Sequence, residues 1–417
     1  MKFELSPQSN QNLDRFCRVY ANNKVCLFTG AGVSFVESER YPSPDWWGLL
    51  KDIYKHIQTH VNLSLAGRDF EQIEKKYPRP WDMADFFARK VGDNIELGKI
   101  IGKIINEKVT TDLTYKRLPI GYLNQAATLN AIISFCSRIR AIRRHPCLSP
   151  NNDRVKSVIT LNYDCFLESG ATTKYNAAPF KPMTEGSRKP RKSQLPVYHI
   201  HGYAPYGSVF KITPQSLCCL GKQNLPNDLL NTLQSLQVSE PINQVKLLKP
   251  LRDTLGKEVL QKYKKQVLGC TVTDRHPKHP LVMTSKSYKT AYAKGGYAAD
   301  ILDTFLGRYS TLFIGTSFDD KELIEKLNKL AGKKSPEHFA MIRSKDSEKI
   351  LGRLAATRVS AIIYQEHGEI PSILSQIYQA AMDPEVLIPK EDKAGKIIDH
   401  ENFTPHKYWE KLLKNKR

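Results

Sequence analysis

The chain has 417 residues, enough to bury a large core, and its apolar content of 41% is ordinary for a globular protein. Lysine and arginine (63) outnumber aspartate and glutamate (42), which leaves a formal net charge of +21. The start of the chain is mostly polar, and no apolar run approaches the roughly 20 residues of a membrane span. We therefore expect a soluble, cytoplasmic protein. The basic excess favours contact with nucleic acid or an acidic partner surface, but equally a protein that simply stays soluble.

The first half of the chain alternates little between strand and helix. Asn12–Tyr20 is predicted to be a short helix that leads into a strand at Val25–Thr29. After it, apolar residues at helical spacing predict four helices and no strong strand before Lys156. These helices are Trp46–Ile57, Met83–Arg89, Gly98–Glu107 and Leu123–Arg140. We interpret residues 35–155 as a helical insertion that forms a lid or subdomain.

In the second half, strands and helices alternate. Strands are predicted at Val155–Leu161, Pro196–Ile200, Leu281–Thr284, Tyr309–Gly315, Phe339–Ile342 and Ala361–Tyr364. Helices are predicted at Tyr292–Leu306, Lys321–Leu330 and Ile373–Met382, and Ala177–Pro196 is predicted to be a loop. This order indicates an α/β fold with a doubly wound parallel sheet. The predicted units are a domain over residues 1–382, with a basic insertion at about 220–270, and a charged tail over 383–417.

The first predicted strand is followed by small residues. Gly30, Ala31 and Gly32 remove side-chain bulk at that point, and Ser34 adds a hydroxyl. Such a turn lets pyrophosphate oxygens approach backbone N–H groups at a helix N-terminus. An ordinary glycine turn is the alternative, and the third glycine of a dehydrogenase fingerprint is missing.

Two further strand ends carry polar side chains. Asn162 can hold a water and a ribose hydroxyl without becoming charged, or it can cap the next helix. Asp164 can contact a ligand or only cap the residues that follow it. His201 precedes a glycine, and its imidazole titrates near neutral pH, whereas His199 should point to the opposite face of its strand.

The predicted strand at Tyr309–Gly315 ends in Gly315, Thr316 and Ser317. Asp319 and Asp320 follow, and favourable charge at a helix N-terminus explains at least one of them. Ligands of open α/β sheets lie beyond the carboxyl ends of the strands, so these motifs predict one composite dinucleotide site.

Together the four motifs resemble those of sirtuins, and more closely those of the bacterial sirtuin-like NADases of anti-phage defence. The quoted motifs are GAGVS, TLNYD, HIHG and GTS, in that order along the chain. The resemblance implies a Rossmann-like sirtuin fold and a site that binds NAD as substrate. It assigns catalysis to Asn162 and His201, and NAD contacts to Gly30, Ala31, Gly32, Ser34, Asp164, Gly315, Thr316 and Ser317.

The chain departs from sirtuins in two ways. Its eight cysteines include no Cys-x-x-Cys pair, so we expect reduced thiols, no structural zinc and no other metal. Pro44, Asp45, Trp46 and Trp47 stand where sirtuins carry Pro-Asp-Phe-Arg, and the arginine is missing. Both departures argue against a protein deacylase. The alternatives are that deacylase and a regulatory subunit that binds NAD or ADP-ribose without turnover.

The resemblance also implies an assembly. Proteins of this kind are held inactive until a phage cue or a companion protein acts. We expect a homo-oligomer that docks onto a HerA-type hexameric ATPase. The candidate contact segments are the part Leu49–Arg144 of the helical insertion, the basic stretch Lys246–Lys265 and the tail Asp383–Arg417.

Overall fold

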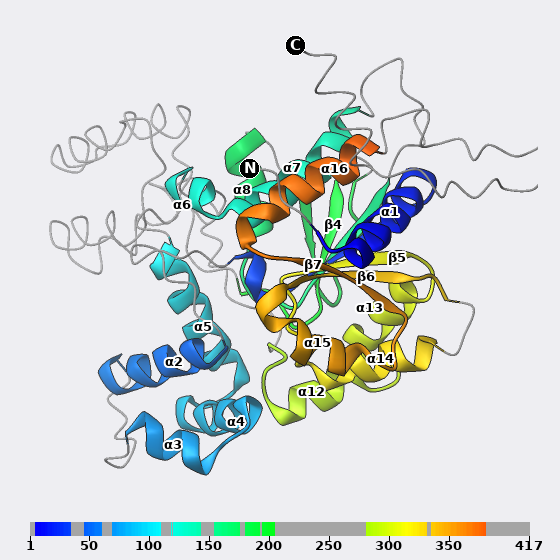
Figure 1. The fold of residues 1–417 in the computed structure, drawn as a ribbon. Helices are drawn as coiled ribbons and strands as arrows, with labels where there is room; N and C mark the ends of the chain where they lie inside the picture. The colour runs from blue at the N-terminus through cyan, green and yellow to red at the C-terminus, as the bar shows by residue number, and fades with distance from the viewer. Residues whose placement is uncertain are drawn as a thin grey trace, which may run out of the picture.

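The computed structural model shows an α/β fold built on a seven-stranded, all-parallel sheet (Figure 1). The structure describes residues 5–34, 46–60, 69–109, 118, 120–142, 154–175, 180–191, 194–204, 281–331 and 335–380. The predicted fold class is confirmed. The predicted basic insertion and the charged tail lie outside the described residues.

The strands are short apolar runs because a parallel sheet is covered on both faces. Every residue of β1 (Val25–Thr29) and β5 (Ser310–Ile314) is buried. The remaining strands are β2 (Val155–Thr160), β3 (Phe180–Met183), β4 (Leu195–His199), β6 (His338–Arg343) and β7 (Val359–Tyr364).

The strand order places a topological switch point at β1. Across the sheet the order is β3-β4-β2-β1-β5-β6-β7, so the chain builds one side from β1 and later returns to build the other. In register, Thr29 lies beside Thr160 of β2 and beside Ile314 of β5. The carboxyl ends of these three strands are therefore level with one another. Open α/β sheets bind their ligands at such a point.

One face of the sheet is covered by α1 (Pro7–Asn22), α7 (Ala127–Ile142), α8 (Phe166–Tyr175) and α16 (Ile370–Ala380) (Figure 1). The short α6 (Ile120–Gln125) joins this side. Helix α1 begins sharply because the Ser6 Oγ accepts the Ser9 N–H at 3.2 Å and Pro7 occupies the first turn.

The opposite face is covered by α12 (Ser285–Tyr292), α13 (Tyr297–Leu306), α14 (Lys321–Ala331) and α15 (Ser347–Leu354). Helix α12 starts with a capping box between Thr284 and Ser287. Its partner α13 begins after Gly295 and Gly296, and Gly295 has a φ of +80° that favours glycine.

A third core lies beside the sheet. Helices α2 (Trp46–His60), α3 (Phe70–Lys76), α4 (Pro80–Val91) and α5 (Asn94–Val109) pack around it and form a separate cluster in Figure 1. Tyr163, at the end of β2, reaches into this core and donates its hydroxyl to the Val282 carbonyl at 2.8 Å. Residues 35–155, interpreted from the sequence as one insertion, therefore contribute to two cores: α2–α5 pack around the third core, whereas α6 and α7 pack on the sheet.

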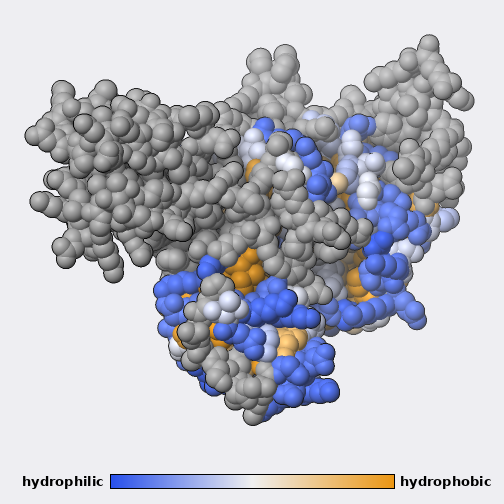
Figure 2. Space-filling view, turned by 90° about the vertical axis from the view of Figure 1, so that its left-hand side faces the viewer, coloured by the Kyte–Doolittle hydropathy of each residue, from blue (hydrophilic) through white to orange (hydrophobic). Residues whose placement is uncertain are grey.

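The described surface in Figure 2 is largely hydrophilic, and its apolar areas are small and separate from one another. Ile95 and Leu351 are the exposed large hydrophobic residues of the described part. No helix there combines the length and the apolar character needed to cross a membrane.

Three sequence-based predictions of elements were wrong. The predicted loop Ala177–Pro196 contains β3, an outer strand of the sheet, where its Pro182 is tolerated. Leu281–Thr284 forms a buried turn, and its run of apolar residues has the same sequence pattern as a buried strand. The predicted helix Tyr292–Leu306 begins only at Tyr297, because the two glycines separate it from α12. No helix was predicted at α3, α8, α12 or α15.

Candidate active site

The loops after β1 and β5 touch each other at the switch point. The Gly30 N–H donates to the Ile314 carbonyl at 3.1 Å, and the Gly32 N–H donates to the Gly315 carbonyl at 3.0 Å. A Cβ on Gly30 would lie 2.5 Å from the Gly315 oxygen, and one on Gly315 would lie 2.6 Å from the Val33 nitrogen. Gly315 also has a φ of +66°. The close packing of the two loops therefore requires glycine at both positions, whether or not a ligand also approaches them.

The turn after β1 is a 3-10 helix at Ala31–Val33. The α-helix expected directly after it falls on residues 35–45, outside the described residues. Ala31 is exposed and Ser34 is buried. The Tyr122 hydroxyl donates to the Ser34 carbonyl at 2.8 Å, which anchors the end of this loop to α6.

Ser34, Asn162 and Asp164 form a hydrogen-bonded cluster between the ends of β1 and β2. The Ser34 hydroxyl donates to the Asp164 Oδ2 at 3.2 Å, and the Asn162 Nδ2 donates to the Ser34 Oγ at 3.4 Å. Two of the expected motifs, 128 residues apart in the chain, therefore meet at one point.

Asp164 has two roles in this cluster. Its Oδ1 accepts the Phe166 N–H at 3.0 Å and so caps α8. Burial raises the pKa of this carboxyl to about 6, although the Phe166 N–H and the Ser34 hydroxyl oppose the shift. Burial thus makes the ionised form of Asp164 unfavourable. A neutral residue such as asparagine or serine would cap α8 equally well, so capping alone does not explain an aspartate here.

His199 lies at the end of β4 with both ring nitrogens engaged. Its Nδ1 is 3.1 Å from the Asn162 carbonyl oxygen, and its Nε2 is 2.9 Å from Glu168 Oε1 on α8. The residue is buried, and burial disfavours its charge. The nearby Glu168 carboxylate and the two hydrogen bonds outweigh burial and raise the pKa of His199.

His201 faces the other side of the sheet. Its Nε2 lies 2.7 Å from the Tyr292 hydroxyl of α12 and 3.2 Å from Asp320 Oδ2. The ring centroid of Tyr163 is 6.5 Å away. The two histidines of HIHG thus have partners on opposite sides of the sheet, but strand alternation does not explain this, because residues two apart in a strand share a face. The cause is that β4 ends at His199 and the chain turns there, with the Gly202 N–H donating to the His199 carbonyl at 3.1 Å.

Thr316, directly after Gly315, has a buried hydroxyl without a hydrogen-bond partner in the structure. A buried polar atom is normally satisfied, so an unpaired hydroxyl at the end of a strand fits a ligand that supplies the partner. Ser317 is exposed, and its carbonyl accepts a hydrogen bond from Arg353 at 2.8 Å. The ribose or phosphate groups of a dinucleotide match these donors and acceptors.

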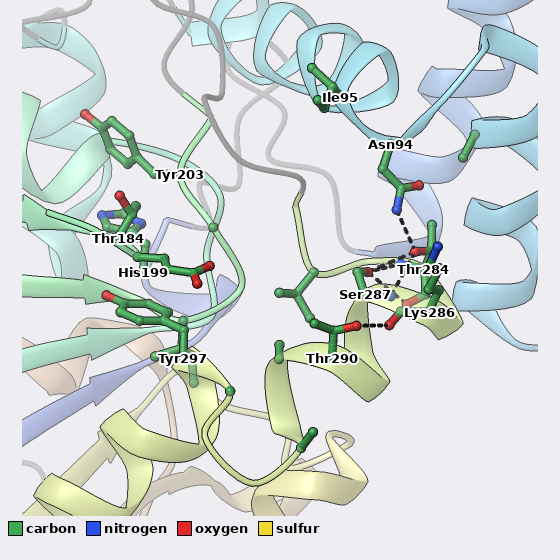
Figure 3. Close-up of a pocket in the computed structure, with 18 of the residues that line it drawn as sticks. Asn94, Ile95, Thr184, His199, Tyr203, Thr284, Lys286, Ser287, Thr290 and Tyr297 are labelled. Carbon is green, nitrogen blue, oxygen red and sulfur yellow. Dashed lines mark hydrogen bonds between the residues drawn. The ribbon is translucent and has the colours of Figure 1, made fainter.

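A large pocket of about 1300 Å³ adjoins this cluster (Figure 3). It lies over the ends of β3 and β4, between the α4–α5 turn and helices α12 and α13. His199, Tyr203 and Tyr297 stand on one side, and Asn94, Thr284 and Lys286 stand on the other. None of the predicted catalytic or NAD-contacting residues lines it, His201 included, and of the four motifs only His199, Ile200 and Gly202 do. The hydrogen-bonded cluster of Ser34, Asn162 and Asp164 lies at the switch point, outside the pocket lining.

Within the described ranges, no group of three or more His, Cys, Asp or Glu side chains could hold a metal ion. The four described cysteines, Cys17, Cys26, Cys136 and Cys165, are buried, and none of them forms a disulfide. The absence of zinc stays a prediction.

Residues 264–362 match the sequence profile of the SIR2-like domain. The matched segment includes β5 and the Gly315–Ser317 motif, whereas the motifs at β1, β2 and β4 precede it. No curated protein sequence matches the chain. A SIR2-like domain implies NAD-related activity, which agrees with the composite site.

Sequence reasoning missed three side chains around the two histidines. Tyr288 and Tyr292 are four residues apart on α12, a spacing that places them on one face of that helix. Glu168 lies four residues after Asp164, in the first turn of α8. Only the tertiary structure shows that these residues meet His201 and His199.

Proposed function

We propose that the protein is a NAD nucleosidase that cleaves the bond between nicotinamide and ribose. The observation that carries this proposal is the meeting of Ser34, Asn162 and Asp164 at the switch point of the sheet, where the strand β5 also ends and is followed by the unpaired Thr316 hydroxyl. The SIR2-like match over residues 264–362 supports NAD as the ligand.

The chemistry needs little from the protein beyond position. The leaving nicotinamide is a cationic pyridinium, so cleavage gives neutral nicotinamide and oxocarbenium-like charge on the ribose. A water oxygen then bonds to the ribose carbon and loses a proton, which yields ADP-ribose. Asn162 would place the water, and His201 would accept a hydrogen bond or proton from a ribose hydroxyl. The loops Gly30–Ser34 and Gly315–Ser317 would hold the phosphates and the adenosine end.

Analysis of the products after incubation with NAD tests this function. We expect nicotinamide and ADP-ribose in equal amounts without any added acyl peptide. Recovery of intact NAD from a protein that binds it would establish the regulatory alternative. Release of nicotinamide only in the presence of an acyl-lysine peptide would establish a deacylase.

We also propose that this activity serves anti-phage defence by depletion of NAD. An uncontrolled NADase would deplete its own cell, so a switch is needed, and a homo-oligomer docked on a HerA-type hexameric ATPase would supply it. The motif resemblance supports this assembly. Light scattering should give a mass well above that of the monomer, and NAD consumption should change when the product of the neighbouring gene is added. A monomer that is fully active alone would contradict it.

A further inference from the structure

His201 sits in a closed cage of aromatic and acidic groups. Its side chain and that of Asp320 are 6% and 7% exposed. Tyr288 meets the imidazole edge-on at a centroid distance of 5.1 Å, and Tyr292 stacks on Tyr288 with an interplanar angle of 9°. The ring of His201 therefore has little freedom to turn.

Asp320 is held by two elements at once. Its Oδ1 accepts the Leu323 N–H at 3.0 Å and caps α14, whereas its Oδ2 accepts the Tyr292 O–H at 3.0 Å. Burial opposes its charge, but the hydrogen bonds from His201, Leu323 and Tyr292 lower the pKa of the carboxyl. The carboxylate that faces His201 is therefore ionised and fixed in place.

These contacts decide which nitrogen of His201 carries the proton. The Tyr292 hydroxyl donates its only hydrogen to Asp320. Its oxygen can therefore only accept a hydrogen bond from the imidazole. Asp320 can also only accept. The Nε2 of His201 faces both oxygens, at 2.7 and 3.2 Å, and must therefore be the N–H donor. In the neutral ring the lone pair is then on Nδ1.

We propose that Asp320, together with Tyr292, is a positioning residue that fixes His201 in the Nε2–H tautomer and so makes Nδ1 the atom that accepts the ribose hydroxyl proton. This rests on the proposed function. The proton moves from the hydroxyl to Nδ1, and the imidazolium that forms is stabilised by the Asp320 carboxylate. Once water has added to the ribose carbon, the proton returns from Nδ1 to the same ribose oxygen, so ADP-ribose leaves with its hydroxyl. No other bond of the protein forms or breaks. The logic is that of a carboxylate that orients a catalytic imidazole.

The substitution Asp320→Asn tests this role, because asparagine caps a helix as well as aspartate does. The substitution keeps the shape of the side chain and its cap on α14, but it removes the negative charge that selects the tautomer of His201. We expect kcat to fall at least about tenfold while KM for NAD stays within about twofold, with an unchanged melting temperature. The matched control is Asp319→Asn, since Asp319 pairs with Arg353 at the surface, and it should keep wild-type kcat.

A second measurement separates failure of this proposal from failure of the proposed function. Long-range ¹H–¹⁵N spectra should show His201 as the Nε2–H tautomer in the wild-type protein and lose that signature in Asp320→Asn, whether or not NAD is cleaved. If Asp320→Asn does not fold, Tyr292→Phe removes only the hydroxyl, and kcat should fall about two- to tenfold. An Nδ1–H tautomer in the wild type, or full kcat in the folded Asp320→Asn protein, would overturn the proposal.

Discussion

His199 and His201 lie two residues apart, and both face a buried carboxylate, yet their surroundings permit different chemistry. His199 meets an acceptor at each nitrogen, the Asn162 carbonyl and Glu168. His201 has Tyr292 and Asp320 at Nε2 alone, and no described residue hydrogen-bonds to its Nδ1. An imidazole with both nitrogens committed holds other groups in place, whereas one with a lone pair left can take a proton.

The comparison also explains how the strand ends are linked. His199 contacts the Asn162 carbonyl and Glu168 of α8, so it can support the predicted catalytic amide, and it also lines the pocket of about 1300 Å³. His201 is fixed from the α12 and α14 side. We therefore expect substitutions at the two histidines to separate catalysis from support.

The largest expected effect is on turnover in Asn162→Ala. The substitution removes the amide but leaves the carbonyl that His199 holds, so the fold should be intact by circular dichroism. Loss of one positioned polar group costs about 10²–10³ in kcat, or roughly 3–4 kcal/mol. Retention of more than about a tenth of wild-type turnover would show that the Asn162 side chain does not act in catalysis.

The next effect compares the two histidines directly. We expect His199→Ala to keep far more NAD turnover than His201→Ala, measured at a temperature where both are folded. Removal of His199 leaves Glu168 buried without its partner, which is destabilising. The double variant His199→Gln with Glu168→Gln removes both members and serves as the control for folding. Equal loss of turnover in folded His199 and His201 variants would contradict the comparison.

A smaller effect is expected on stability in Asp164→Asn. Asparagine can keep both hydrogen bonds, to Phe166 and Ser34, without the buried charge. Because folding raises the pKa of Asp164 from 3.8 to about 6, its contribution to stability is present below about pH 4 and is lost as the pH rises through 6. The variant should therefore be more stable than the wild type at pH 7.5, by about 1–3 kcal/mol, and the gap should close toward pH 4. Denaturant titrations at several pH values measure it, and a less stable variant at pH 7.5 would contradict the assigned cost.

The smallest effect concerns the pH dependence contributed by His199. Folding raises its pKa, so the stabilisation is fully present below the unfolded value of about 6.5 and is lost as the pH rises through the folded value. Relative to the double variant His199→Gln with Glu168→Gln, the wild type should lose free energy of unfolding as the pH rises above about 6.5. A difference that stays constant with pH would show that His199 is not held charged in the folded protein.

Much of the sheet could be predicted from the sequence because buried parallel strands are short apolar runs. The bounds of β1 were predicted exactly, and β2 and β5 within one or two residues. The strand β3 could not be predicted, since Phe180–Met183 contains Lys181 and Pro182 and pairs only at the edge. The turn at Leu281–Thr284 is buried by the third core, and local sequence does not distinguish that burial from a strand.

The site could be predicted only in part for a similar reason. The strand order brings the ends of β1, β2 and β5 together, so motifs such as Ser34 and Asn162 could be grouped in advance. The partners on helices, Tyr292 and Glu168, depend on how α12 and α8 pack against the sheet. The motifs predicted a ligand contact for Gly30 and Gly315, and the structure adds the close contact between their two loops.

NAD binding and nicotinamide release, measured on one sample of His201→Ala, test the central claim most directly. If the dinucleotide is held by the loops after β1 and β5 while His201 acts only in the chemical step, the variant should bind NAD with a Kd within about threefold of the wild type and release nicotinamide at least about 100-fold more slowly. Release of nicotinamide at the wild-type rate by folded His201→Ala would contradict the account.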